Sequence, residues 1–200
     1  SIADIEAGGG VFITFPTVNE KMSEVKIQTH VINEGENDKG ARIKHVIKKG
    51  NDIVEEVTAD IILRKGKQGN TWCYTVEMDS PALWSPDRPT LYTLETTIYD
   101  EDGMVMDRNT ERFGIRKFEF KDNQLYINGK KTYLRGVNRH QEYPYIGYAL
   151  SENAQYRDAY KIKKAGFDYV RLSHYPHSPA FMDACDELGL VVADAILGWQ

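Results

Sequence analysis

The sequence predicts a multidomain β plus α/β protein: an immunoglobulin-like β-sandwich over residues 8–117, then part of a (β/α)8 barrel over 118–200. In the first region, about seven short runs alternate apolar and polar residues between turn residues, which is typical of half-buried antiparallel strands. In the second region, strand and helix patterns alternate, which indicates a parallel sheet with helical crossovers. Only the first three barrel strands are expected, because a closed barrel needs eight strands in about 250 residues.

The sandwich strands are predicted from period-two alternation and from the turn residues that follow. Residues 25–31 place apolar side chains and Thr29 at every second position, and the run stops at Asn33-Glu34-Gly35. Residues 72–78 and 92–98 alternate in the same way. Asp100-Glu101-Asp102-Gly103 has the composition of a hairpin loop, so we expect residues 104–107 to begin the next strand.

A small hairpin is expected where the second region begins. Phe118 and Phe120 form one arm, residues 125–127 form the other, and Asn128-Gly129 is a candidate tight turn. The region thus opens with antiparallel pairing before its parallel strands.

The parallel strands are expected at residues 133–137, 169–173 and 190–194. The first crossover helix is expected over 151–165, with Ser151 as its N-cap and Gly166 at its end. The second is expected over 179–188 and is closed by Gly189.

Composition and charge narrow the range of partners. The net charge is only -5 with both signs interspersed, so neither nucleic acid nor an anionic membrane is expected as a partner. No apolar run approaches the roughly 18 residues of a membrane span, and residues 1–6 lack the pattern of a signal peptide. The compartment stays open between the cytoplasm and a periplasmic or secreted location. Cys73 and Cys185 are interpreted as buried thiols rather than as a disulfide pair.

Polar side chains gather at the C-terminal ends of the three expected parallel strands. Asn138 and His140 follow the first strand, Arg171 and His174 the second, and Asp194 ends the third. Substrates bind at this edge in parallel α/β folds, so these five residues are the candidate substrate ligands. Directed donors suit sugar hydroxyl groups, but many chemistries use the same edge, so the pattern alone predicts only a polar active-site mouth.

Three motifs resemble consecutive signatures of the family 2 glycoside hydrolases. They are Arg-Gly-Val-Asn-Arg-His at 135–140, Val-Arg-Leu-Ser-His-Tyr-Pro at 170–176 and Cys-Asp-Glu-Leu-Gly-Leu at 185–190. Leu-Trp-Ser-Pro at 83–86 and Phe-Gly-Ile-Arg at 113–116 resemble the end of that family's immunoglobulin-like domain. Gly-Tyr-Ala at 147–149 and His-Ser-Pro at 177–179 look more like the β-galactosidases than the β-glucuronidases or β-mannosidases.

The resemblance implies a role for each candidate ligand. Asn138, His140 and His174 would line the subsite of the terminal sugar, Arg171 would support the nucleophilic carboxylate, and Asp194 would lie at the floor of the pocket. The substrate would be a β-galactoside or a related oligosaccharide.

The resemblance also implies a retaining mechanism. The family uses two glutamates about 5 to 5.5 Å apart, and both come from later barrel strands. This chain is therefore expected to hold no catalytic residue of its own and to be inactive when isolated, while its parent would be an O-glycosyl hydrolase. The alternatives are a β-glucuronidase or β-mannosidase of the same family, or a non-catalytic module that binds a glycan or a protein.

Two positions depart from the family pattern, which usually has Asn at Asp168 and often Glu at Ala195, so the electrostatics of the second and third strands could differ. No metal or cofactor site is expected in this chain, although some family members bind magnesium or sodium. His174 and His177 are unsuited to a shared metal because Pro176 and Pro179 prevent one regular helix. A partial barrel would leave strand edges open, so self-association is a further expectation.

The remaining histidines and tryptophans receive structural interpretations. His30 and His45 are expected on solvated strand faces. Trp72 and Trp84 are interpreted as packing residues of the sandwich and of the join between regions rather than as platforms for sugar rings.

Overall fold

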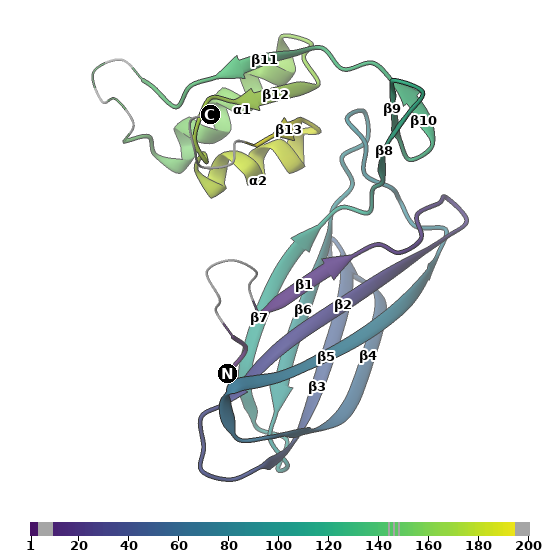
Figure 1. Cartoon of the computed structure of the whole chain (residues 1–200), viewed down its shortest axis with the longest axis vertical. Coiled ribbons are helices and arrows are strands. Elements are labelled where there is room, and N and C mark those ends of the chain that lie inside the picture. The colour runs from purple at the N-terminus through teal and green to yellow at the C-terminus, as the bar shows by residue number, and fades with distance from the viewer. Residues whose placement is uncertain (4–9, 144, 146, 148, 195–200) are drawn as a thin grey trace. The chain divides into compact units, whose positions relative to one another are not determined.

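The computed structural model describes residues 1–3, 10–143, 145, 147 and 149–194, and it consists of two compact units (Figure 1). The first unit comprises Ser1–Ala82 and Leu91–Ile115, and the second comprises Leu83–Thr90 and Arg116–Gln200. The chain thus leaves the first unit for eight residues, returns to it, and leaves it again at Arg116.

The first unit is a sandwich of two antiparallel sheets, with strand orders β1-β2-β5 and β4-β3-β6-β7. Because β4 forms a hairpin with β3, it lies in the sheet that also contains β6 and β7. The strands are β1 (Val11–Thr14), β2 (Met22–Asn33), β3 (Lys39–Lys49), β4 (Asp52–Leu63), β5 (Gly66–Asp79), β6 (Tyr92–Tyr99) and β7 (Val105–Phe113). The seven strands and two sheets confirm the predicted immunoglobulin-like architecture.

Period-two alternation builds the core of the sandwich. Val25, Ile27, Thr29 and Val31 of β2 are at most 1% exposed, whereas Lys26 and Gln28 between them are exposed. Ile43 of β3 and Ile98 of β6 pair in register and are equally buried. Burying these branched side chains contributes about 1.5–3 kcal/mol each, which makes the alternation the main determinant of which face points inward.

His45 corrects one expectation, because it lies in the core and not on a solvated face. It is 1% exposed, its Nδ1 and Oγ1 of Thr96 are hydrogen-bonded at 3.0 Å, and its ring meets Tyr74 edge-on at 5.6 Å. Its position alternates in phase with Ile43 and Ile47, so β3 directs it inward. Burial lowers the pKa of His45 to about 4, because the charged imidazolium would lose its hydration.

The cysteines also differ from expectation. Both thiols are free, as predicted, but only Cys185 is buried, while Cys73 is exposed on β5. Burial raises the pKa of the Cys185 thiol to about 12, so this residue behaves as a small apolar side chain.

The second unit contains a three-stranded antiparallel sheet in the order β10-β9-β8. Its strands are β8 (Phe118–Lys121), β9 (Gln124–Ile127) and β10 (Lys130–Thr132). The hairpin between β8 and β9 turns at Asp122-Asn123, whose φ angles are 51° and 57°. The expected hairpin is therefore present but with a different turn, because Asn128-Gly129 leads from β9 into β10.

A three-stranded parallel sheet with two helices completes the second unit, and its order is β11-β12-β13 (Figure 1). The elements are β11 (Gly136–Arg139), α1 (Glu152–Lys164), β12 (Tyr169–Leu172), α2 (Pro179–Leu188) and β13 (Val191–Ala193). This is the start of a (β/α)8 barrel, as predicted, although β11 begins later than expected. Ser151 caps α1 by accepting from the Ala154 amide, and Gly189 ends α2 with a φ of 76°.

The helices cover one face of the parallel sheet. Val170 and Leu172 of β12 are at most 1% exposed and pack with Ala159 of α1 and with Phe181 and Ala184 of α2. In the described part of the chain, no helix is both long enough and apolar enough to cross a lipid bilayer.

Both tryptophans in the described residues serve packing. Trp72 packs against the sandwich core, and Trp84 is 1% exposed within the second unit. Nε1 of Trp84 donates to the Asp186 carbonyl at 2.8 Å, and the Arg116 guanidinium lies over its ring at 4.7 Å. Neither is therefore an open platform for a ligand.

The buried His45 makes the stability of the sandwich dependent on pH. Below pH 6.5 the unfolded chain takes up a proton that the folded chain rejects until about pH 4, so stability is lost as the pH falls through this window. We expect the wild type to lose about 2 kcal/mol between pH 7 and pH 5 through this residue. Urea unfolding at both pH values, beside His45→Gln, measures the difference. An equal loss in the variant, which keeps a polar group but cannot titrate there, would contradict the assignment.

Candidate functional site

The register of the parallel sheet brings the candidate ligands to one edge. Asn138 pairs with Arg171, and Arg171 pairs with Ala193, which directly precedes Asp194. All the strands run in the same direction, so their C-terminal ends lie together. Alternation then separates the side chains: those of Val170 and Leu172 face the helices, whereas Asn138 and Arg171 are exposed on the opposite face.

Two histidines extend this edge just beyond the strands. The rings of His140 and His174 lie edge to face, with centroids 5.9 Å apart and an interplanar angle of 80°. Nη2 of Arg171 is 3.4 Å from Nδ1 of His174. A guanidinium can only donate, so Nδ1 of His174 is the acceptor in this contact. The five sequence-predicted residues are thus exposed at or next to the C-terminal ends of three adjacent strands.

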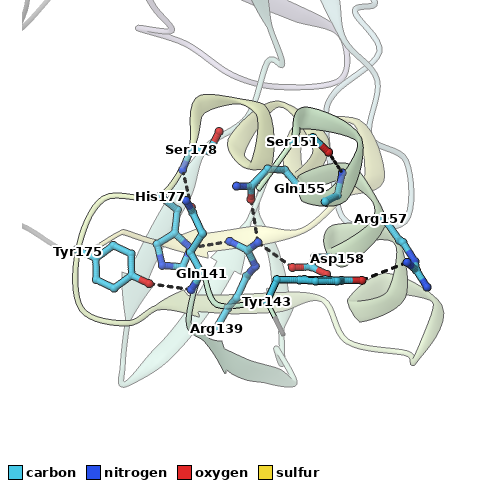
Figure 2. Close-up of polar contacts among 11 residues, drawn as sticks. Arg139, Gln141, Tyr143, Ser151, Gln155, Arg157, Asp158, Tyr175, His177 and Ser178 are labelled. Carbon is cyan, nitrogen blue, oxygen red and sulfur yellow. Dashed lines mark hydrogen bonds and ion pairs between the residues drawn. The ribbon is translucent and has the colours of Figure 1, made fainter. Parts of the chain in front are cut away.

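Behind this edge lies a buried polar cluster centred on Arg139 (Figure 2). The Arg139 side chain is 6% exposed and donates to three partners: His177 Nδ1 at 2.9 Å, Gln155 Oε1 at 2.8 Å and Asp158 Oδ2 at 2.8 Å. Its guanidinium also stacks over the Phe181 ring at 3.9 Å. The cluster joins β11, α1 and the segment that leads into α2.

The loops after β11 and β12 are cross-linked by a second set of hydrogen bonds (Figure 2). The Gln141 amide donates to the Tyr175 hydroxyl at 2.8 Å, and the Ser178 amide donates to Oε1 of Gln141 at 3.0 Å. Further along the first loop, Tyr143 pairs with Gly147 through two backbone hydrogen bonds of 3.0 Å. The Tyr143 hydroxyl accepts from Arg157 of α1 at 3.1 Å.

His177 is held neutral by its surroundings. Burial lowers its pKa first, and the positive charge of Arg139 lowers it further, while the backbone of Ser173 and the charge of Asp194 act in the opposite direction. Because Nδ1 accepts from Arg139, the proton of the neutral ring is on Nε2. His177 is therefore unavailable as a metal ligand through Nδ1. Among the described residues, no three His, Cys, Asp or Glu side chains gather closely enough to hold a metal ion.

Sequence reasoning missed the roles of Arg139, Gln155 and His177. One signal was available: Arg139 lies between Asn138 and His140 on a short strand, so alternation directs it away from them and toward the helices. Gln155 lies one turn before Ala159 on the buried face of α1. The helical pattern predicts apolar residues on this face, so it does not single out a glutamine. The need of a buried guanidinium for acceptors explains why a glutamine occupies that position.

Asp168 lies at the opposite end of β12 from the candidate ligands. It directly precedes Tyr169, the first residue of β12, and its Oδ1 accepts from Nζ of Lys163 at 3.0 Å. The same Nζ donates to the carbonyls of Pro86 and Gly189, each at 3.0 Å. The charge of Asp168 is thus neutralised at the N-terminal edge of the sheet. The other departure, Ala195, lies outside the described residues.

Comparison with known sequences identifies the family. The profile described as "Glycosyl hydrolases family 2, TIM barrel domain" matches residues 118–197, and the profile described as "Glycosyl hydrolases family 2" matches residues 5–116. The chain belongs to glycosyl hydrolase family 2. The parallel edge described above is therefore the start of a family 2 barrel.

Relatives carry more than one activity name. A β-galactosidase of Thermoanaerobacter pseudethanolicus is 37% identical over 192 residues, which is 95% of this chain and 25% of that protein. The structure of Bacteroides uniformis β-glucuronidase 2 is 30% identical with a TM-score of 0.83, and covers 94% of this chain and 23% of its own. A family 2 member from Bacteroides cellulosilyticus gives a TM-score of 0.87 at 29% identity, covering 94% and 24%. This family 2 chain therefore spans about a quarter of the length of these relatives.

The Lys163 contacts predict a local contribution to stability. Lys163→Met removes one ion pair and two hydrogen bonds to carbonyls, so we expect the free energy of opening of α1 and β12 to fall by about 1–3 kcal/mol. Amide hydrogen exchange of these two elements measures the loss. The neighbouring Lys164→Met is the control, because its Nζ lies 5.9 Å from the Tyr160 ring centroid and exchange should change little. Equal loss in both variants would show that the effect is one of helix composition.

Proposed function

We propose that this chain supplies the sugar-binding edge of a retaining β-glycosidase whose longer polypeptide hydrolyses terminal β-D-galactosides. The observation that carries the proposal is the juxtaposition of Arg171, His174 and His140 at the C-terminal edge of the sheet. Sugar hydroxyl groups need several directed partners within a small area, and these side chains supply them together with the Asn138 amide. Family membership favours glycoside chemistry at this edge.

Each residue has a role within this proposal. His174 is exposed beside Arg171 and His140, and its imidazole would form a directed hydrogen bond with a sugar hydroxyl. Asn138 can both donate and accept, which suits a hydroxyl group that does the same. Arg171 carries a permanent positive charge on the open face and would hold the nucleophilic carboxylate in its ionised state.

The two catalytic glutamates would come from later strands of the longer polypeptide. In a retaining enzyme they stand about 5 to 5.5 Å apart, one as nucleophile and one as acid/base. The chain described above would contribute binding and orientation, and a magnesium or sodium ion, where one is used, would be held elsewhere. The structure of the Bacteroides uniformis relative is described as covalently bound to cyclophellitol-6-carboxylate aziridine, which is consistent with a covalent mechanism in the family.

A β-glucuronidase is the second candidate, and the name of that relative favours it. The two substrates differ at the C6 carboxylate, which requires a positively charged partner. A glucuronide would therefore compete with the nucleophile for Arg171 unless another cation lies nearby. The residues at 147–149 and 177–179, which resemble those of β-galactosidases, favour the galactoside.

The substrate assignment can be tested with nitrophenyl β-galactoside, β-glucuronide and β-mannoside and the full-length polypeptide. We expect selective β-galactoside turnover, and a fall in kcat/KM of at least about tenfold in His174→Ala, the cost of one lost hydrogen bond. His30→Ala is the matched control, because His30 contacts Thr71 in the sandwich. The 200-residue chain alone should turn over none of the three substrates. Selective turnover of the glucuronide would identify a glucuronide rather than a galactoside as the substrate. No turnover of any substrate would favour a non-catalytic binding module.

We also propose that the isolated chain self-associates through its parallel sheet. In the described part of the chain, β11 and β13 are edge strands of a three-stranded sheet whose barrel fold requires eight. Sedimentation velocity over a range of concentrations should show a mass that increases with concentration, and β11 amides should exchange more slowly in the associated form. A single monomeric species throughout the range would contradict this expectation.

A further inference from the structure

The buried Arg139 cluster contacts the chain on both sides of the candidate ligands. The Arg139 carbonyl accepts from the Ser173 amide at 2.9 Å, and the Arg139 guanidinium donates to His177 at 2.9 Å. His174 lies in the segment between these two contacts. One residue of β11 therefore holds both ends of the five-residue segment 173–177 that carries the proposed sugar ligand.

We propose that Arg139 is a positioning residue, which fixes the loop after β12 against the loop after β11 and so sets His174 against His140. Only the predicted effect of Arg139 on turnover rests on the function proposed above. Arg139 itself faces the helices and touches none of the five candidate ligands through its side chain in the contacts described. It acts through His177 and through the main chain.

His140 is held in place through the residues that precede and follow it in the sequence. Arg139 precedes it and Gln141 follows it, and both bind the segment 173–178. Gln141 uses its backbone amide toward Tyr175 and its side-chain carbonyl toward Ser178. Three contacts that involve side chains connect the two loops (Figure 2). The backbone contact from Ser173 to Arg139 is the fourth, and the four lie on either side of His140 and His174 in the sequence.

The chemistry of the cluster requires a guanidinium. Its planar fork satisfies His177, Gln155 and Asp158 in three directions while its face stacks on Phe181. An ammonium group is a compact charge and cannot maintain all four contacts. Asp158 is 22% exposed, so the ion pair is partly screened. Losing the cation would also leave the buried acceptors of Gln155 and His177 without this donor.

Arg139→Met tests the proposal in the 200-residue chain by NMR of the histidine rings. We expect the nuclear Overhauser contact between His140 and His174 to weaken and the Nε2–H tautomer of His177 to lose its dominance. The pKa of His177 should rise, because the variant lacks the positive charge of Arg139, which lowers this pKa in the wild type. The other neighbours stay in place: Asp194 and the Ser173 backbone raise the pKa of His177, and His140 lowers it. Arg42→Met is the matched control, because it removes a guanidinium that binds Asp60 at the same 2.8 Å in the sandwich.

A second pair of variants separates positioning from folding. His177→Gln keeps an acceptor for Arg139 and should retain the contact between His140 and His174, whereas His177→Leu should lose it. This pair decides the matter even if Arg139→Met does not fold. Equal signals in the two His177 variants, or an unchanged ring contact in a folded Arg139→Met, would overturn the proposal.

Turnover by the longer polypeptide gives the functional consequence. Arg139→Lys should lower kcat/KM by at least about tenfold, because misplacing binding groups by about 1 Å is costly, and Arg42→Met should stay within about twofold of the wild type. Unchanged turnover in Arg139→Lys would overturn the role in catalysis. If the unmodified polypeptide cleaves no β-glycoside, the proposed function fails, and the ring signals still decide whether Arg139 positions the two loops.

Discussion

A guanidinium buried among protein atoms must be matched by acceptors, and much of the second unit is arranged around this requirement at Arg139. Its partners come from α1, through Gln155 and Asp158, and from the segment before α2, through His177. Removing one of these acceptors would leave a buried N–H group of Arg139 without a partner, which costs about 1–3 kcal/mol. The sheet and both helices therefore become mutually dependent through one side chain, beyond the apolar packing that any such layer provides.

In the parallel sheet, the burial of Arg139 determines which neighbouring side chains are exposed. Adjacent residues of a strand face opposite sides, so the burial of Arg139 directs Asn138 to the open face. The register then places Asn138 opposite Arg171, and the loops continue to His140 and His174. The polar edge that we propose to bind a sugar thus follows from strand alternation and register.

Local patterns in the sequence predicted most elements because they depend on near neighbours. Ser151 and Gly189 mark their helix ends through capping chemistry that acts within one turn. The wrong predictions concern residues whose burial depends on partners distant in the sequence. His45 is buried because β3 directs it toward Thr96 and Tyr74, and composition alone does not reveal which polar residue lies inward. The sequence placed the five candidate ligands at the ends of their strands, where they lie, and their role as ligands stays a prediction. The Arg139 cluster depends on contacts across 16 to 38 residues that no local pattern contains.

The N-terminal and C-terminal ends of the parallel strands differ in their polar contacts, and this difference bears on how family 2 chains diverge. At the N-terminal edge, Lys163 binds Asp168 and the carbonyls of Pro86 and Gly189, so the departure at Asp168 is compensated where it occurs. Asp168 and the site are at opposite ends of β12, and salt screens exposed charges over about 8 Å at physiological ionic strength. A change of charge at this edge is therefore expected to alter stability rather than the proposed binding of a sugar. Differences in substrate choice between members are then expected in the loops beyond the C-terminal edge, such as the loop that Gln141 and Tyr175 cross-link.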